Sequence, residues 1–370
     1  MIADIYSVII YWTGLFCTLV LAAIYPRLKI RNKVFNVLWI ALMCLPLSII
    51  AGMRSYVGTD YVNYVRIFNE IKELTFFECI THSYLDRGFA FIVRSLWLVV
   101  FDVKVMFFIF AFATLFIAFK TVSKYKSEIS MVLFALFYYL IIYHHSLNVM
   151  RQCLAISLLL WSLSLMLERR YIRGLIVCLA TMLIHDTAFI GIAFLIVIMI
   201  FDSKKQQSKL EGRKISLIRL IYYCAVFVSI FIIPVLLDIM MRIPFLSAYQ
   251  HYGVDSVDIG LGRFAYFVLL LAPVVIMWKN VVSDRKVFSL FHVVLLYLPI
   301  SFVGYYFDWA SRMNLYTTIM VVLLALLVIR KEEKWWLRMA GYLWYIAVFA
   351  IPYVTDILVK NYGETFPYLV

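Results

Sequence analysis

Apolar runs alternate with short polar segments along almost the whole chain. About 20 apolar residues cross the hydrocarbon core of a bilayer as a helix. Continuous runs such as residues 322–329 lack the alternation of β-barrel strands. The pattern therefore predicts an all-α polytopic membrane protein. We expect about twelve transmembrane helices, near residues 4–25, 34–52, 104–121, 129–147, 148–168, 171–185, 186–201, 216–240, 263–278, 288–305, 313–329 and 338–356.

Lysine and arginine cluster in alternate loops, as in residues 27–33, 168–173 and 204–214. Because cytoplasmic loops carry an excess of Lys and Arg, these loops are predicted to face the cytoplasm. The first run precedes such a cluster and lacks a basic segment before it, so it is predicted to be a retained helix and not a signal peptide. With twelve crossings, both ends of the chain are expected on the outer face.

One apolar segment, residues 88–101, is too short to cross and contains Arg94. We predict that it is re-entrant or interfacial on the outer face; the alternative is a tilted crossing helix, which would invert every later loop. We expect one integral membrane domain, 1–370, with long external loops at 53–103 and 242–263. Residues 61–74 carry Val62, Val65, Phe68, Ile71 and Leu74 at a spacing of three, which predicts a helix lying on the membrane surface.

Composition supports the membrane assignment, with 65% hydrophobic residues and a net charge of +13. In a soluble protein this charge would suggest nucleic acid, but here most of it lies in the predicted cytoplasmic loops, and no nucleic-acid partner is expected. The six cysteines show no metal-ligand spacing. No disulfide framework and no cofactor are expected.

A second set of arginines lies at the outer helix ends, where few positive charges are expected: Arg54, Arg87, Arg151, Arg263 and Arg312. An anionic substrate is the simplest reason for them. Arg151 and Gln152 open a membrane helix, where free N–H groups attract anions. The alternatives are arginines that reach lipid headgroups, anchor the interface, or, at Arg312, pair with Asp308.

Two further groups could take part in proton transfer. His185 stands between two apolar runs and can serve as a general base near neutral pH. Asp60, after Gly58 and Thr59, could face a sugar hydroxyl. The structural alternatives are a helix-junction cap around Asp186 and a capped interfacial helix starting at Tyr61.

The chain resembles the EpsG-like group of Wzy-type polysaccharide polymerases. The resemblance is carried by Arg54 with Gly58-Thr59-Asp60-Tyr61 and Tyr64, by Asn148 with Arg151-Gln152, by His185, and by Arg312 with Tyr316. It implies a GT-C-like, metal-independent glycosyltransferase of the bacterial inner membrane, with its active site on the periplasmic or outer face. Such polymerases extend surface polysaccharides such as O-antigen from undecaprenyl-diphosphate-linked oligosaccharides, which serve as donor and acceptor.

The residue chemistry fits this reaction, because a diphosphate leaving group needs cations and the acceptor needs a base. The expected diphosphate contacts are Arg54, Arg151, Arg312 and Arg263. We expect His185, or else Asp60, as the base. The expected sugar contacts are Tyr56, Tyr61, Gln152, Tyr249 and Tyr252. Membrane lipids and a chain-length regulator are further expected partners. A lipid-linked oligosaccharide flippase and a membrane acyltransferase or ligase remain alternatives.

Overall fold

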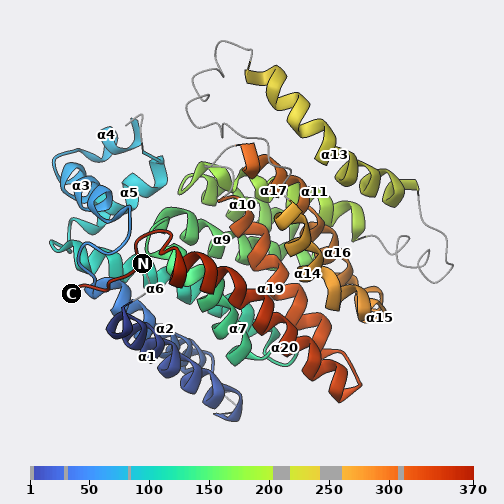
Figure 1. The fold of residues 1–370 in the computed structure, drawn as a ribbon. Helices are drawn as coiled ribbons and strands as arrows, with labels where there is room; N and C mark the ends of the chain where they lie inside the picture. Colours follow the sequence, from blue (N-terminus) through green and yellow to red (C-terminus); the bar gives the residue numbers. More distant parts are fainter. Residues whose placement is uncertain (1–3, 29–31, 82–84, 203–216, 242–260, 307–311) are drawn as a thin grey trace. The chain divides into compact units, whose positions relative to one another are not determined.

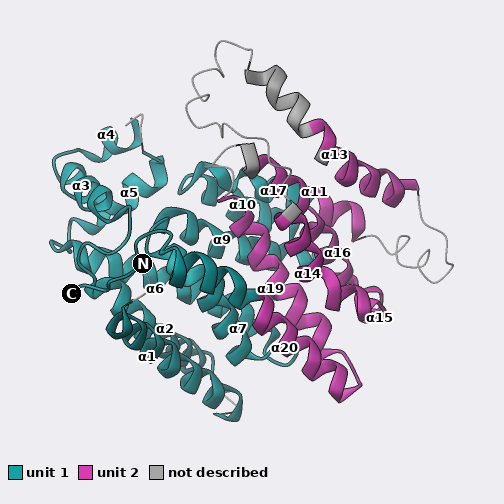
Figure 2. Cartoon of the chain, in the orientation of Figure 1, with its two compact units in different colours: residues 1–195, 349–370 teal, residues 196–348 magenta. Residues whose placement is uncertain are grey.

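The computed structural model describes residues 4–28, 32–81, 85–202, 217–241, 261–306 and 312–370 (Figure 1). The described residues form helices and no strand, as the apolar runs predict. The chain comprises two compact units (Figure 2): unit 1 is residues 1–195 and 349–370, and unit 2 is residues 196–348.

The α-helices of unit 1 are α1 (Ile5–Ile24), α2 (Lys33–Met53), α3 (Tyr61–Lys72), α4 (Phe76–Thr81), α5 (Arg87–Leu96), α6 (Val103–Val122), α7 (Met131–Tyr138), α8 (His144–Ser146), α9 (Met150–Leu167) and α10 (Tyr171–Met182). Short 3₁₀ segments are Tyr25–Leu28, Ser123–Tyr125 and Asp186–Phe189, and π-helical segments are Tyr139–Tyr143 and Tyr353–Val359. Helix α11 (Ile190–Phe201) continues into unit 2. Unit 2 contains α13 (Leu217–Met241), α14 (Leu261–Ile276), α15 (Trp278–Val282), α16 (Arg285–Leu295), α17 (Tyr297–Tyr306), α19 (Asn314–Arg330) and most of α20 (Trp335–Pro352).

Each of the twelve predicted spans corresponds to a helix, but the helices differ in length. Six are long and apolar enough to cross a membrane: Ile5–Leu28, Lys33–Met53, Val103–Tyr125, Met150–Leu167, Arg285–Val303 and Trp335–Val359. The other six apolar helical segments have 10–17 residues where their side chains are described; of the 25 residues of α13, this covers Leu217–Ser229. Helix α10, with 12 residues, rises about 18 Å, which is less than the roughly 30 Å hydrocarbon core.

Polar side chains at the predicted boundaries fix several helix starts. Asn32 accepts hydrogen bonds from the backbone N–H groups of Val34 and Phe35 at the start of α2. Asp102 accepts one from Lys104 N–H at the start of α6, and Ser130 accepts one from Leu133 N–H at the start of α7. Each satisfies an N–H group that has no partner inside its helix. Within unit 1, α2 packs on α6, α6 packs on α9, and α9 packs on α10.

The loop 53–103 is folded. Helices α3, α4 and α5 share a hydrophobic core with the N-terminal parts of α6 and α9, which includes Phe68, Phe89, Phe107 and Met150. Helix α5 has 10 residues and rises about 15 Å, too little to cross; this supports the re-entrant or interfacial prediction for 88–101. Arg94 donates to the carbonyl of Leu74 at 2.7 Å and lies over the Phe76 ring.

The helix predicted over 61–74 is present, but its predicted apolar stripe is wrong at one end. Val62 is 62% exposed, whereas Tyr61, Tyr64, Phe68 and Ile71 are buried. A spacing of three falls 60° short of a full turn at each step, so a buried stripe needs steps of three and four in turn. The buried side of α3 faces the core shared with α5 and α6.

Candidate functional site

Three ionisable side chains from distant parts of unit 1 meet at one carboxylate. Arg151 Nη1 donates to Asp86 Oδ2 at 2.7 Å, and His185 Nδ1 lies 3.4 Å from the same oxygen. The backbone N–H of Asp186 donates to Asp86 Oδ1 at 3.4 Å. Arg151 stands in the first turn of α9 and His185 just after α10, so Asp86 joins the adjacent ends of two packed helices.

The loop that carries Asp86 is held against α10 by its backbone. Gly88 N–H donates to the Leu183 carbonyl at 2.6 Å. A Cβ at position 88 would lie 2.6 Å from that carbonyl oxygen, a separation that side chains do not show. Glycine therefore permits the close approach that brings Asp86 to His185.

The electrostatics of the cluster favour a charged Asp86. Burial alone would raise the pKa of Asp86, but the His185 hydrogen bond and the Arg151 charge outweigh it and lower the pKa. Arg151 uses one of its five N–H donors on this carboxylate, and its side chain is 24% exposed. Among the residues that the structure describes, no three His, Cys, Asp or Glu side chains are grouped as metal ligands.

The contact with Asp86 orients the His185 ring. When Nδ1–H donates to Asp86, Nε2 carries the free lone pair. The side chain is 23% exposed. The carboxylate beside the His185 ring belongs to Asp86, 99 residues away in the chain, and not to the adjacent Asp186.

Arg54 and Arg151 contact two different aromatic rings that both pack on Tyr64. The Arg54 guanidinium stands 4.4 Å from the centroid of the Phe107 ring. The Tyr64 ring packs on both Phe107 and Phe89, and Arg151 lies over Phe89 at 5.3 Å. Arg54 is only 1% exposed, and burial lowers its pKa although nearby tyrosines oppose the shift.

The remaining predicted site residues of unit 1 lie nearby on the loop 53–103 and α9. Asp60 precedes α3 as its N-cap, but its side chain makes no capping hydrogen bond. Tyr56 is 76% exposed and packs on the buried Tyr61 ring at 5.5 Å. Gln152 is buried in α9.

Arg263 and Arg312 belong to unit 2 and lie near one end of its helices. Arg263 donates to the Ser301 carbonyl at 2.9 Å, and the Ser301 hydroxyl donates to Asn314 Oδ1 at 3.1 Å. Asn314 opens α19, two residues after the exposed Arg312. Tyr249, Tyr252 and Asp308 lie outside the described residues.

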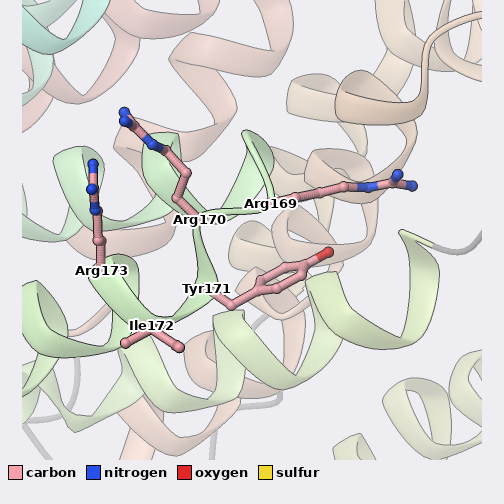
Figure 3. A pocket seen from close by; sticks show the side chains of 5 residues that line it. All are labelled: Arg169, Arg170, Tyr171, Ile172 and Arg173. Carbon is pink, nitrogen blue, oxygen red and sulfur yellow. The ribbon is translucent and has the colours of Figure 1, made fainter.

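A separate basic cavity lies at the opposite ends of α9 and α10. Its volume is about 410 Å³, and its lining residues are Arg169, Arg170, Tyr171, Ile172 and Arg173. Arg170 and Arg173 project to one side, and Arg169 projects the other way (Figure 3). These arginines belong to a loop that is predicted to be cytoplasmic. They follow the end of α9, whereas Arg151 lies at its start, and the 18 residues of this helix rise about 27 Å.

Comparison with known proteins gives one result. The model of the EpsG family matches residues 37–370, which include every residue of the Asp86 cluster and both unit 2 arginines. This match confirms the resemblance to the EpsG family that the sequence indicated. No curated protein and no solved structure matches the chain.

Proposed function

Because the chain belongs to the EpsG family of polysaccharide-biosynthesis membrane proteins, we propose that it is a glycosyltransferase that polymerises undecaprenyl-diphosphate-linked oligosaccharide units. The reaction takes place on the outer, periplasmic face of the bacterial inner membrane and needs no metal. The growing glycan passes from its lipid diphosphate to the terminal sugar of a new lipid-linked unit.

The observation that carries this proposal is the sharing of Asp86 by His185 and Arg151. Glycosyl transfer needs a base for the acceptor hydroxyl and positive charge for the departing diphosphate. One carboxylate here orients an imidazole and holds a guanidinium beside it. The two required groups are therefore held within one cluster.

In the proposed step, the acceptor hydroxyl oxygen forms a bond to the anomeric carbon of the donor sugar while His185 Nε2 takes the hydroxyl proton. The bond between that carbon and the diphosphate oxygen breaks, and the lipid diphosphate leaves with the electron pair. Donors of Arg151 that Asp86 does not use stabilise the developing charge. His185 then releases its proton to the diphosphate or to water. Asp86 is a positioning residue in this scheme.

An apolar cavity between α2 and α6 suits the polyprenyl chain. It has a volume of about 240 Å³, and Lys104 and apolar residues, including Met53 and Phe108, line it. Arg54 directly follows Met53 at the end of α2. A lipid tail lying in this cavity would bring its phosphate groups close to the outer arginines.

The other predicted contacts complete the proposal. In unit 1, Arg54 binds diphosphate oxygens and Asp60 is the alternative base. In unit 2, Arg263 and Arg312 stay predicted contacts of the diphosphate. Tyr56, Tyr61, Gln152, Tyr249 and Tyr252 contact sugars, since aromatic faces pack on the apolar faces of sugar rings.

The proposal predicts that Arg151→Ala and Arg312→Ala abolish polymer while single lipid-linked units persist in cells. Purified His185→Ala should elongate glycan about 10²–10⁴-fold more slowly, because the step loses its base. Product length is measured by gel electrophoresis and mass spectrometry with purified lipid-linked units.

The matched control is Arg173→Ala, an exposed arginine at the far end of the adjoining helix α10, which should leave the ladder unchanged. Normal chain-length ladders from both Arg151→Ala and Arg312→Ala would refute the polymerase assignment. In reconstituted vesicles, movement of the lipid-linked unit without elongation would identify a flippase. Transfer of an acyl group would identify an acyltransferase.

A further inference from the structure

A second polar site lies within unit 1, under the segment 361–370. Arg54 and His144 are both almost fully buried, at 1% and 2% exposure. Arg54 Nε and His144 Nε2 have no hydrogen-bond partner among the described residues. Buried polar atoms are nearly always satisfied, so two such atoms in one region need an explanation.

The two groups share the same tyrosines. The Tyr11 ring lies 4.8 Å and the Tyr143 ring 5.5 Å from the His144 ring, measured between centroids. Tyr11 and Tyr143 are also the strongest electrostatic neighbours of Arg54. Among the described residues, no carboxylate forms an ion pair with Arg54. A buried cation without a counter-ion is costly, and the Phe107 ring offsets only part of that cost.

The segment 361–370 covers this region and holds it closed. The Tyr11 hydroxyl donates to the Thr365 carbonyl at 2.9 Å, and the Thr365 hydroxyl lies 3.3 Å from His144 Nδ1. Tyr368 N–H donates to Ser7 Oγ, and the Tyr368 hydroxyl donates to the Ile50 carbonyl. These contacts place an irregular strip of chain over the tyrosines, near both chain ends (Figure 1).

The segment 361–370, here called the cover, is also hydrogen-bonded to the backbone just after Arg54. Carbonyl groups of the segment accept hydrogen bonds from the N–H groups of Ser55, Gly58 and Thr59, at 2.8–3.1 Å. The Asn148 carboxamide lies against both Gly58 and Gly363, whose backbones have φ of +100° and +91°. Besides these hydrogen bonds, Phe366 packs on Tyr11 and His144, and Tyr368 packs on Tyr11. The segment forms no helix of its own, so it can separate locally without unfolding one.

The neighbouring helices are irregular at the same place. The π-helical segment Tyr139–Tyr143 leads directly into His144, and the π-helical segment Tyr353–Val359 leads into the cover. The hydroxyls of Tyr139 and Tyr353 lie 3.4 Å apart between these segments. π-helical turns occur frequently at functional sites.

We infer that Arg54 and His144 form a closed binding site for a phosphate group, and that the segment 361–370 is its removable cover. With the cover removed, the guanidinium, the imidazole and the Tyr11 hydroxyl, which donates to Thr365 when the site is closed, can donate to phosphate oxygens. A separate apolar cavity between α2 and α6 is lined by Met53, the residue before Arg54, and could take the lipid that carries such a phosphate. The inference deepens the proposed function, because that phosphate would belong to a lipid-linked substrate.

The test follows cover opening by hydrogen–deuterium exchange of the Gly58 and Thr59 amides, in the full chain in phosphatidylcholine nanodiscs. A ligand that binds only the open state raises the open population. Inorganic pyrophosphate or undecaprenyl diphosphate should speed exchange of these amides at least about fivefold. Tyr368→Ala should raise basal exchange and tighten pyrophosphate binding about fivefold, because the cover loses contacts that compete with the ligand.

Variants of Arg54 separate binding from folding. Arg54→Met should abolish the exchange response and yet raise the thermal midpoint, because a buried unpaired charge is replaced by an apolar side chain. A structural arginine would instead lower the midpoint when replaced. The matched control, Arg66→Met at a side chain 63% exposed, should keep the full response.

The two probes identify the source of the phosphate. A response to both assigns the phosphate group itself, and a response to undecaprenyl diphosphate alone assigns the lipid-linked form. Unchanged exchange with both probes, or a response that persists in Arg54→Met, overturns the inference. No sugar transfer is measured, so loss of polymerase activity and loss of this site are separate results.

Discussion

Asp86 is the residue on which the candidate catalytic cluster depends. Its side chain is 9% exposed and contacts both Arg151 and His185. Removing the carboxylate would leave Arg151 without its ion-pair partner and His185 without the acceptor that orients it. We expect a cost of roughly 3 kcal/mol in stability, as for other buried ion pairs that lose one partner.

The lowered pKa of Asp86 gives a pH prediction. A depressed folded-state pKa contributes stability above the unfolded value of about 4, and this contribution is lost as pH falls through the folded-state pKa. The thermal midpoint of the native protein should therefore exceed that of Asp86→Asn from neutral pH down to about pH 4, and the gap should close below it. Midpoints measured from pH 7 to pH 3 check this; a gap that stays constant to pH 3 would contradict it.

Sequence reasoning identified two of the three cluster residues. Arg151 and His185 could be predicted because ionisable side chains at the ends of apolar runs are costly without a function. Asp86 could not, because its partners lie 65 and 99 residues away along the chain. The local signal, an aspartate before Gly88 and a short apolar run, indicates a helix start and not a partner. The burial of Arg54 was equally hidden, since it depends on the distant segment 361–370.

At the scale of elements, the helices follow from periodicity and capping, while their packed faces do not. The boundaries of α2, α3 and α6 lie within a few residues of the predicted ones. The apolar stripe of α3 was predicted to lie on the membrane surface, but Phe68 and Ile71 pack in the protein core, because tertiary structure sets the neighbour a helix packs on. The short helix α5 was recognised from its length and from Arg94.

The contact of α5 with the end of α10 gives a test at this scale. Gly88→Ala should lower stability by about 1–3 kcal/mol and polymer synthesis with it, because the added methyl group would separate Asp86 from His185. Thermal unfolding and glycan ladders measure the two effects. Gly262→Ala is the matched control, because a Cβ there meets nothing within 4 Å; equal losses from both variants would exclude the contact as the cause.

At the scale of the whole molecule, the all-helical membrane architecture could be predicted, and the division into two units could not. Apolar length marks helices, but only contacts show that residues 349–370 join the first half of the chain. Six described helices are long enough to cross a membrane by themselves.

Topology is tested by thiol labelling in a background in which the exposed Cys17 and Cys224 are serine. A cysteine in place of Lys124, which lies 4.0 Å from Glu168 at the predicted cytoplasmic end of α9, should resist a membrane-impermeant reagent in intact cells. A cysteine in place of the exposed Val62 should react. External labelling at position 124 would invert the predicted orientation of every later loop.

The Asn148 carboxamide touches glycines that stand 90 positions before it and 215 positions after it in the chain. A methyl group at either glycine would collide with that amide, and both backbones have a φ that other residues rarely adopt. Mutations at these three positions cannot accumulate independently. Over evolutionary time, Gly58, Asn148 and Gly363 should be inherited as a set, and lineages that lose one should have lost or rebuilt the others.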